Sequence, residues 1–327
     1  MSPLNTLPFS ISSAEAFEKA ALDTFRYQAQ YCAVYKEFIA YLGVDSTQVN
    51  SIKDIPFLPI QFFKSHKIIN ENALIEQTFL SSGTTGMSQS KHYVANISVY
   101  EESYQKGFNL FYGPVEDYVV LALLPSYLER EGSSLIYMVE DMIRRSKHIE
   151  SGFYLNDIEV LKNQLLYLES QGKKTLLIGV SFALLDLVES YQFSFKNTIV
   201  METGGMKGKR KEMVREELHN ILKSGFGVDV IHSEYGMTEL LSQAYSKGNG
   251  LFSCPPWMCI MIRDTEDPLS LLPLGKTGGI NVIDLANVNS CSFLATQDLG
   301  RLHTNGDFEI LGRFDNSDIR GCNLLVS

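Results

Sequence analysis

The sequence predicts an α/β fold in which parallel strands alternate with helices, followed by a smaller region of antiparallel strands. Three observations support this prediction. Short apolar runs of strand length take turns with helix-like segments over residues 118–232. After about Gly250, prolines and glycines break the chain into short runs. The 327 residues are 45% hydrophobic and 20% charged, which is ordinary for a globular protein and excludes a disordered chain, a collagen or a coiled coil.

The N-terminal part of the chain predicts helices followed by an extended segment. Between Ser13 and Leu42, apolar residues recur at spacings near three and four, which predicts one or two amphipathic helices. Gly43 then ends the helical pattern. Residues 55–63 contain two prolines, which lack the backbone N–H that a central strand needs, so we expect an extended segment there.

The middle of the chain predicts strand–helix–strand units. The apolar run Tyr118–Leu124 is far shorter than the ~20 residues that cross a bilayer as a helix, so we expect a buried strand and no integral membrane segment. Further strands are expected at Lys174–Val180, Thr198–Glu202 and Val228–His232, and helices at Ser133–Lys147, Asp157–Gln171, Phe182–Tyr191 and Lys209–Lys223. Elements that take turns in this way imply parallel strands joined by crossover helices.

The last part of the chain favours small antiparallel strands and turns, which would form a β-rich lobe. No internal repeat, low-complexity tract or long linker interrupts the sequence. We therefore expect one integrated domain over residues 1–312, followed by a short tail over residues 313–327.

Charge and cysteine usage limit the classes of function. The 28 basic and 38 acidic residues give a net charge of −10, which opposes binding to nucleic acid or to an anionic membrane and favours a small ligand. The five cysteines are widely spaced without a CxxC pair, and residues 1–20 lack the pattern of a signal peptide. We expect a cytoplasmic protein. The six histidines form no HxxxH or HExxH pair, so a zinc site is not expected.

The first candidate motif follows an apolar stretch that ends at Leu80. It consists of four hydroxyl side chains and two glycines: Ser81, Ser82, Gly83, Thr84, Thr85 and Gly86. Glycine lets backbone N–H groups approach an anion closely, and the hydroxyls add donors, so this segment is a candidate phosphate-binding loop. It lacks the GxxxxGK[ST] spacing of a Walker loop, and an ordinary polar turn is the alternative interpretation.

The second motif, Ser233–Glu239, follows an expected strand, at the strand end where open α/β sheets bind ligands. Tyr235 offers a ring for stacking, Gly236 a close backbone approach, and Glu239 an oxygen ligand suited to Mg²⁺. The alternative interpretation is a helix start with Ser233 as its N-cap.

The third motif predicts a β-hairpin. A tight turn at Asn305–Gly306 would place Asp298 at the start of one strand and Arg313 at the end of the next. A carboxylate directed at vicinal hydroxyls is a common way to hold a ribose, so Asp298 is a candidate ribose ligand. A surface hairpin without a ligand is the alternative interpretation.

In this order, the three motifs resemble those of the adenylate-forming superfamily of acyl- and aryl-CoA synthetases, adenylation domains and firefly-type luciferases. The resemblance implies a catalytic α/β domain over residues 1–312, with βαβ layers and a β-rich lobe, that uses ATP and Mg²⁺. The implied positions are the phosphate loop at Ser81–Gly86, the adenine pocket at Gly204 and Gly205, the adenine-stacking and Mg²⁺ loop at Tyr235, Gly236, Met237, Thr238 and Glu239, the ribose ligand Asp298, and the pre-hinge residue Arg313.

The finer resemblance is to the LuxE-type acyl-protein synthetases of the bacterial luciferase fatty-acid reductase system, and it spans nearly the whole chain. The segments that carry it are Phe57–Pro59, Phe63–Lys64, Lys91–Tyr93, Glu202–Gly208, Ser233–Tyr245 and Arg320–Cys322. It implies a ligase that activates a carboxylic acid of the fatty class as an acyl-adenylate and transfers the acyl group to a protein cysteine. It also implies a partner acyl reductase, and Cys322 occupies the place of the acceptor cysteine.

Two differences from the wider superfamily affect this expectation. The mobile C-terminal domain, with its lysine, is not found after Gly312, and Lys91 lies farther from the loop glycine than the usual lysine. His92 is a candidate for contact with phosphate or the acyl carboxylate, with a structural role as the alternative, and Lys91 is a candidate catalytic residue whose role the sequence leaves open. For Cys322 the alternative is a small buried hydrophobic residue, although neighbouring Arg320 would favour its thiolate.

Two other functions stay open at the level of sequence. An acyl- or aryl-CoA ligase of the phenylacetate-CoA ligase type shares these loops but delivers the acyl group to CoA. A nucleotide-binding subunit that stabilises a reductase complex without turnover is the other alternative. ATP–pyrophosphate exchange separates this subunit from the two enzymes, because a protein that only binds ATP catalyses no exchange.

Overall fold

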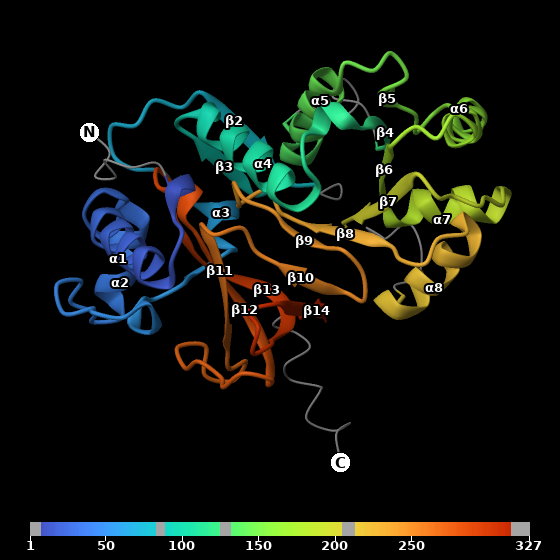
Figure 1. Cartoon of the computed structure of the whole chain (residues 1–327). Helices are drawn as coiled ribbons and strands as arrows, with labels where there is room; N and C mark the ends of the chain where they lie inside the picture. Colours follow the sequence, from blue (N-terminus) through green and yellow to red (C-terminus); the bar gives the residue numbers. More distant parts are fainter. Residues whose placement is uncertain (1–7, 83–88, 125–131, 205–212, 315–327) are drawn as a thin grey trace. The chain divides into compact units, whose positions relative to one another are not determined.

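The computed structural model describes residues 8–82, 89–124, 132–204 and 213–314. These residues divide into two compact units, whose elements are labelled in Figure 1. Unit 1 takes its residues from the ranges Met1–Gln77, His92–Ala95 and Pro256–Ser327, and unit 2 from Thr78–Lys91 and Asn96–Pro255.

The N-terminal part of unit 1 is helical, as the apolar spacing predicts. Its helices are α1 (Ala14–Tyr31), α2 (Ala33–Tyr41) and the short α3 (Phe62–Ser65). The Ser13 hydroxyl caps α1 by accepting a hydrogen bond from the backbone N–H of Ala16 at 3.1 Å. Buried Gln28 of α1 donates to the carbonyl of Asn287 at 2.9 Å. This bond satisfies a polar group in the core and fixes α1 against a distant segment of the same unit.

The strands of unit 1 confirm the predicted β-rich lobe. They are β11 (Met258–Arg263), β12 (Thr277–Asp284), β13 (Phe293–Leu302) and β14 (Phe308–Arg313), and each is antiparallel to the next. The proline-containing strand β1 (Leu58–Pro59) has only two residues, which pair in parallel with the first half of β13. Gly306, in the turn between β13 and β14, has a φ of 88°, which favours glycine. The predicted hairpin is therefore confirmed, but Asp298 lies in the middle of its strand because β13 begins at Phe293.

Unit 2 is built on a sheet whose main strands are parallel. They are β4 (Val119–Leu123), β5 (Gly152–Phe153), β6 (Thr175–Val180), β7 (Thr198–Thr203), β8 (His232–Tyr235), β9 (Ala244–Ser246) and β10 (Leu251–Ser253). Their spatial order is β5-β4-β6-β7-β8-β9-β10, and only the last two strands run antiparallel to their neighbours. All residues of β4 and β6 are buried, which is typical of parallel strands. The predicted parallel units are confirmed.

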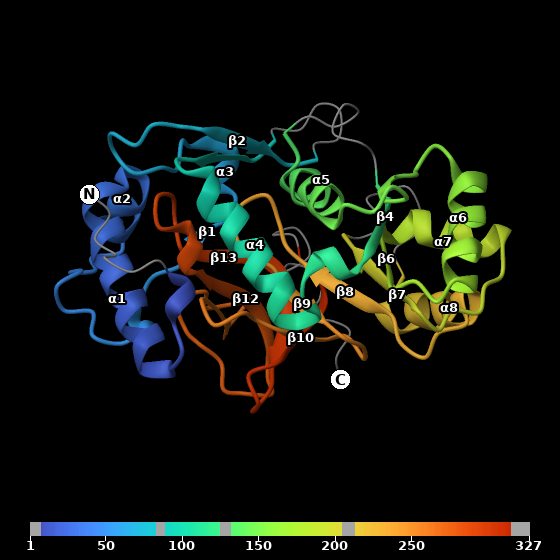
Figure 2. The same ribbon diagram turned by 45° about the horizontal axis from the view of Figure 1, so that its top comes forward.

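Helices alternate with these strands along the chain, and the last four of them join consecutive strands of the sheet. They are α4 (Ile97–Tyr112), α5 (Ser134–Ser146), α6 (Ile158–Ser170), α7 (Ser181–Ser190) and α8 (Arg215–Phe226). Helix α5 packs against β4, whereas α7 packs against β6, β7 and α8 (Figure 2). The shorter segments are β2 (Gln77–Leu80), β3 (Lys91–Val94) and the 3-10 turns Pro8–Ser10, Ile52–Asp54, Val115–Asp117 and Leu285–Asn287. Within the described ranges, no helix is both long and apolar enough to span a membrane.

The predicted start of the last helix is wrong. Helix α8 begins at Arg215 and not at Lys209, because Val214 before it has an extended backbone with φ of −66° and ψ of 144°. Residues 209–212 lie outside the described residues. The sequence gives no cap residue that would mark this start, since Val214 makes no side-chain cap hydrogen bond.

The predicted position of the last parallel strand is also wrong. We expected a strand at Val228–His232, but β8 covers His232–Tyr235. These residues find hydrogen-bonding partners on both sides, because Met201 of β7 lies opposite His232 and Ala244 of β9 lies opposite Tyr235. Ser233 is therefore inside a strand, and its interpretation as a helix N-cap is wrong.

Candidate functional site

The base of the candidate phosphate loop is closed by hydrogen bonds between its two ends. The Ser81 hydroxyl accepts from the backbone N–H of Ser90 at 2.9 Å, and the Ser81 N–H donates to the Ser90 carbonyl at 3.1 Å. The hydroxyl proton of Ser81 is still able to donate, and Ser82 is exposed. The remaining loop residues Gly83, Thr84, Thr85 and Gly86 lie outside the described residues, as do Gly205 and Cys322.

Lys91 and His92 follow the loop on strand β3 and have different surroundings. Lys91 is exposed, whereas the side chain of His92 is fully buried. The His92 ring meets the ring of Phe63 edge to face, with 5.5 Å between centroids. Because successive strand residues project to opposite faces, the two side chains do not share one side of β3. Contact of His92 with phosphate or an acyl carboxylate and a catalytic role of Lys91 stay predictions.

Gly204 forms a turn directly after β7. Its φ of 62° is in the left-handed region that favours glycine. The hydroxyl of Ser181, at the start of α7, lies 2.7 Å from the Gly204 carbonyl oxygen and donates to it. The predicted adenine-pocket residue is thus held at the carboxyl end of a parallel strand, where ligands bind in open α/β sheets.

The predicted Tyr235 loop leaves the neighbouring strand β8. Tyr235 is the last residue of that strand and meets the Phe252 ring edge to face at 6.1 Å. A Cβ atom at Gly236 would lie 2.4 Å from Oε1 of Glu234, so a side chain there would displace that buried carboxylate. Met237 and Thr238 are half-buried, and Glu239 is 7% exposed.

The ends of β7 and β8 are linked directly. The hydroxyl of Thr203, next to the Gly204 turn, donates to Oε2 of Glu234 at 2.5 Å. Both residues are buried. The two loops that the sequence proposes for adenine therefore leave adjacent parallel strands and are joined by a hydrogen bond in the strand residues that precede them.

A buried carboxylate one residue before Thr203 lies among several polar groups. Oε1 of Glu202 is 2.5 Å from Nη1 of Arg215 and 3.5 Å from Nε2 of His219. Burial alone would raise the pKa of this carboxyl, but the hydrogen bond to His219 and the charge of Arg215 outweigh it and hold the pKa below its ordinary value. Glu202 is therefore charged at neutral pH.

Sequence reasoning did not identify this group as functional. In the sequence, Glu202 belongs to an expected strand and to a segment that resembles LuxE-type proteins, and Arg215 belongs to no motif. No short motif could have paired them, because Arg215 belongs to the first turn of a helix and Glu202 to a strand. Only the packing of α8 on the sheet brings them together.

In unit 1, the predicted residues Asp298 and Arg313 lie opposite each other on β13 and β14. Oδ1 of Asp298 is 3.2 Å from Nε of Arg313, and the arginine side chain is 75% exposed. The backbone N–H of Asp298 donates to the Thr296 hydroxyl at 3.1 Å. The hairpin therefore presents a carboxylate and a guanidinium side by side, a donor–acceptor pair suited to polar ligand groups such as ribose hydroxyls.

Glu239 is the one residue predicted to bind Mg²⁺. Within the described part of the chain, no group of three or more His, Cys, Asp or Glu side chains could hold a metal ion. A single carboxylate such as Glu239 is compatible with Mg²⁺ in a nucleotide site, because this ion commonly takes one or two carboxylates together with water and phosphate oxygens.

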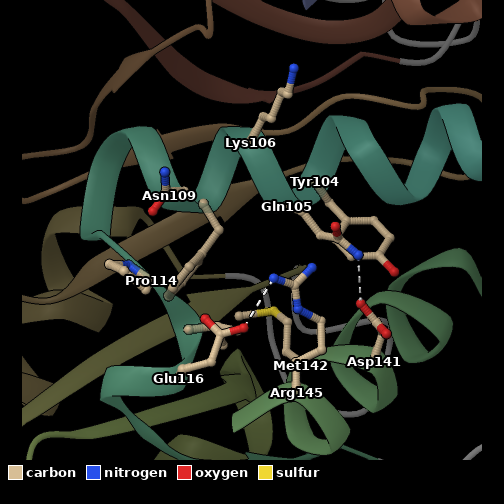
Figure 3. Close-up of a pocket in the computed structure, with 11 residues that line it drawn as sticks. Tyr104, Gln105, Lys106, Asn109, Pro114, Glu116, Asp141, Met142 and Arg145 are labelled. Atoms are coloured by element: carbon tan, nitrogen blue, oxygen red, sulfur yellow. Dashed lines mark hydrogen bonds and ion pairs between the residues drawn. The ribbon is translucent and has the colours of Figure 1, made fainter.

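A separate cavity of about 320 Å³ lies in unit 2 between α4, α5 and the turn at Val115–Asp117 (Figure 3). Figure 3 shows Arg145 directed toward Glu116 and Gln105 toward Asp141, and each pair is 3.1 Å apart. None of the predicted site residues lines this cavity.

Comparison with known proteins first defines the class of fold. MatB from Rhodopseudomonas palustris in its ATP-bound form aligns with a TM-score of 0.54 and 19% identity, over 75% of this chain and 49% of that one. 2-Hydroxyisobutyryl-CoA ligase in complex with 2-HIB-AMP and CoA aligns with a TM-score of 0.68 and 14% identity, over 97% of this chain and 73% of that one. The fold is therefore that of the adenylate-forming ligases, as predicted.

Comparison of sequences then identifies the family that the N-terminal part of the chain resembles. The profile of the family described as acyl-protein synthetase, LuxE, matches residues 4–109. A long-chain-fatty-acid–luciferin-component ligase of Photorhabdus luminescens is 38% identical over 72 residues, which are 21% of this chain and 60% of that protein. The predicted resemblance to LuxE-type proteins is confirmed for this N-terminal part. The chain spans less than two thirds of that relative and about half the length of MatB.

Proposed function

We propose that this chain activates a carboxylic acid with ATP, giving an acyl-adenylate and pyrophosphate. The observation that carries the proposal is the joined pair of strand ends in unit 2, where the Gly204 turn and the Tyr235 loop leave adjacent parallel strands. Strand ends of this kind bind nucleotides in open α/β sheets. The same fold occurs in MatB, solved with bound ATP, and in 2-hydroxyisobutyryl-CoA ligase, solved with 2-HIB-AMP and CoA.

The chemistry follows from the weakness of a carboxylate as an electrophile. A carboxylate oxygen attacks the α-phosphorus of ATP, the bond from that phosphorus to pyrophosphate breaks, and the acyl-adenylate that forms can lose AMP instead of oxide. Ser81 and the loop amides would hold the phosphates, Tyr235 the adenine and Asp298 the ribose. Glu239 would hold Mg²⁺, which would supply charge neutralisation at the phosphates.

We further propose that the acid is a fatty acid and that a cysteine receives it. The thiolate of Cys322 would attack the acyl carbonyl, with AMP as the leaving group, and the resulting thioester would pass to a partner acyl reductase. The LuxE match and the name of the Photorhabdus relative support this choice. A second candidate is transfer to CoA, which the ligase solved with CoA favours because it aligns over 97% of this chain.

The first test is acid-dependent ATP–pyrophosphate exchange. The wild type is expected to catalyse exchange with fatty acids and Mg²⁺, and Glu239→Gln to lose most of it at limiting Mg²⁺. Absence of exchange with every acid tried would leave only a nucleotide-binding protein. Unchanged exchange in Glu239→Gln would remove Glu239 from the Mg²⁺ site.

The second test identifies the acceptor. Radiolabelled fatty acid and Mg-ATP are incubated with the protein, with and without CoA, and the denatured protein is treated with hydroxylamine. We expect a labile acyl label without CoA, and Cys322→Ser to keep exchange but lose the label. Formation of acyl-CoA without labelled protein would replace the cysteine acceptor by CoA.

A further inference from the structure

The Glu202 carboxylate, on β7, contacts groups from two other elements of unit 2. Its Oε2 accepts from the hydroxyl of Ser181 at the start of α7, at 3.1 Å, and its Oε1 pairs with Arg215 of α8 at 2.5 Å. Its side chain is only 6% exposed, so the charge depends on these partners. Glu202 itself is on β7, two residues before the Gly204 turn.

One arm of this network reaches the Gly204 turn. Ser181 lies within hydrogen-bonding distance of both Glu202 Oε2, at 3.1 Å, and the Gly204 carbonyl oxygen, at 2.7 Å. Its single proton is therefore shared or alternates between them. The Glu202 carboxylate thus orients the Ser181 hydroxyl, and this hydroxyl in turn holds the backbone of Gly204.

The other arm reaches Tyr235. Nη1 of Arg215 also donates to the hydroxyl of Ser233 on β8, at 3.2 Å. The guanidinium lies 5.0 Å from the centroid of the Phe252 ring, and this ring packs edge to face with Tyr235. Arg215 thus contacts strand β8, which carries Tyr235, directly. It reaches the Tyr235 ring through Phe252.

We propose that the Glu202–Arg215 ion pair is a positioning device that sets the Gly204 turn and the Tyr235 ring relative to each other for binding the nucleotide. An exposed ion pair would contribute little to positioning or stability. This pair, in contrast, connects β7, β8, α7 and α8 at the ends of the strands. The inference rests on the proposed function in taking ATP as the ligand. It is distinct from catalysis, because neither side chain is assigned to contact the reacting atoms.

The experiment measures the ATP affinity and the ATP KM of four variants. Arg215→Met removes the pair, Arg215→Lys keeps the charge without the planar group over Phe252, and Ser181→Ala and Ser233→Ala each cut one arm. We expect the ATP KM and the Kd for Mg-ATP to rise by about tenfold or more in Arg215→Met, and by about three- to tenfold in the other variants. The KM for the acid is expected to stay unchanged, and kcat to fall less than the ATP affinity.

Arg145→Met is the matched control, because it breaks the 3.1 Å pair with Glu116 in the same unit without touching either loop. It is expected to leave the ATP KM unchanged. Thermal unfolding of every variant separates positioning from stability, since a purely structural role lowers the melting temperature and the active fraction but not the ATP KM. Should Arg215→Met fail to fold, Arg215→Lys and Ser181→Ala decide the question.

Wild-type ATP affinity in folded Arg215→Lys and Ser181→Ala would overturn the inference. Equilibrium dialysis with labelled Mg-ATP keeps this outcome separate from failure of the proposed function. If the wild type binds ATP but exchanges no pyrophosphate with any acid, acid activation is wrong, while the Kd values of the variants still test the positioning role. A wild type that binds no ATP would overturn both.

Discussion

Two carboxylate–guanidinium pairs of this protein share their chemistry but differ in their surroundings. Asp298 and Arg313 in unit 1 are 3.2 Å apart, with side chains that are 10% and 75% exposed. Glu202 and Arg215 in unit 2 are 2.5 Å apart, with side chains that are 6% and 29% exposed. Both carboxylates are buried, so the pairs differ in the exposure of the guanidinium group. An exposed guanidinium gains little from its partner in water, whereas a buried carboxylate that loses its counter-charge becomes costly. We therefore expect the Asp298–Arg313 pair to be available to a ligand and the Glu202–Arg215 pair to stabilise the fold of unit 2.

Arg215→Met should give the largest change in stability. It leaves the buried Glu202 carboxylate without its main counter-charge, so the free energy of unfolding is expected to fall by about 3–5 kcal/mol. Urea unfolding at neutral pH measures this change. A loss below about 1 kcal/mol would mean that the pair behaves like an exposed one.

Asp298→Ala should weaken ATP binding strongly but change the stability only slightly. The ATP KM is expected to rise by about ten- to a hundredfold, because a hydrogen bond from a ligand to a charged group contributes about 1.5–3 kcal/mol. The free energy of unfolding should change by no more than about 1 kcal/mol, since Arg313 is mostly exposed. An unchanged ATP KM in the folded variant would place the ribose elsewhere.

His232, next to Ser233 on β8, extends the comparison to a half-buried group that is neutral at pH 7. Burial, together with the charge of Lys247, lowers the pKa of His232 from 6.5 to about 4. Between these pH values the unfolded chain binds a proton that the folded protein does not, so stability falls as the pH drops from 6.5 toward 4. The loss from this partly exposed ring should be on the order of 1–2 kcal/mol.

Urea unfolding between pH 7 and pH 4 measures this effect against two variants. His232→Gln should lose this part of the pH dependence. Tyr112→Phe removes the 3.2 Å hydrogen bond to Nδ1 of His232 but keeps the ring, and should retain the pH dependence. A slope in His232→Gln equal to that of the wild type would assign the titration to another group.

The difference between the two ion pairs also explains which parts of the site were predictable. Asp298 and Arg313 lie on two strands joined by one short turn, so the sequence places them on adjacent strands, although a register shift between Leu299 and Gly300 sets their exact pairing. Glu202 and Arg215 are joined by packing of α8 on the sheet, which no local spacing encodes. Ser181 and Phe252 were missed for the same reason, since their roles depend on which strand end lies beside which.

The sequence by itself determined the α/β class, most helix and strand positions and the hairpin, because these depend on local periodicity and turn chemistry. Tertiary structure decided the start of α8 at Arg215, the shift of β8 to His232–Tyr235, and the burial of Glu202 among its partners. Those features depend on pairing with β7 and β9 and on the need of a buried charge for a counter-charge. Such contacts join residues that become neighbours only when the sheet has formed.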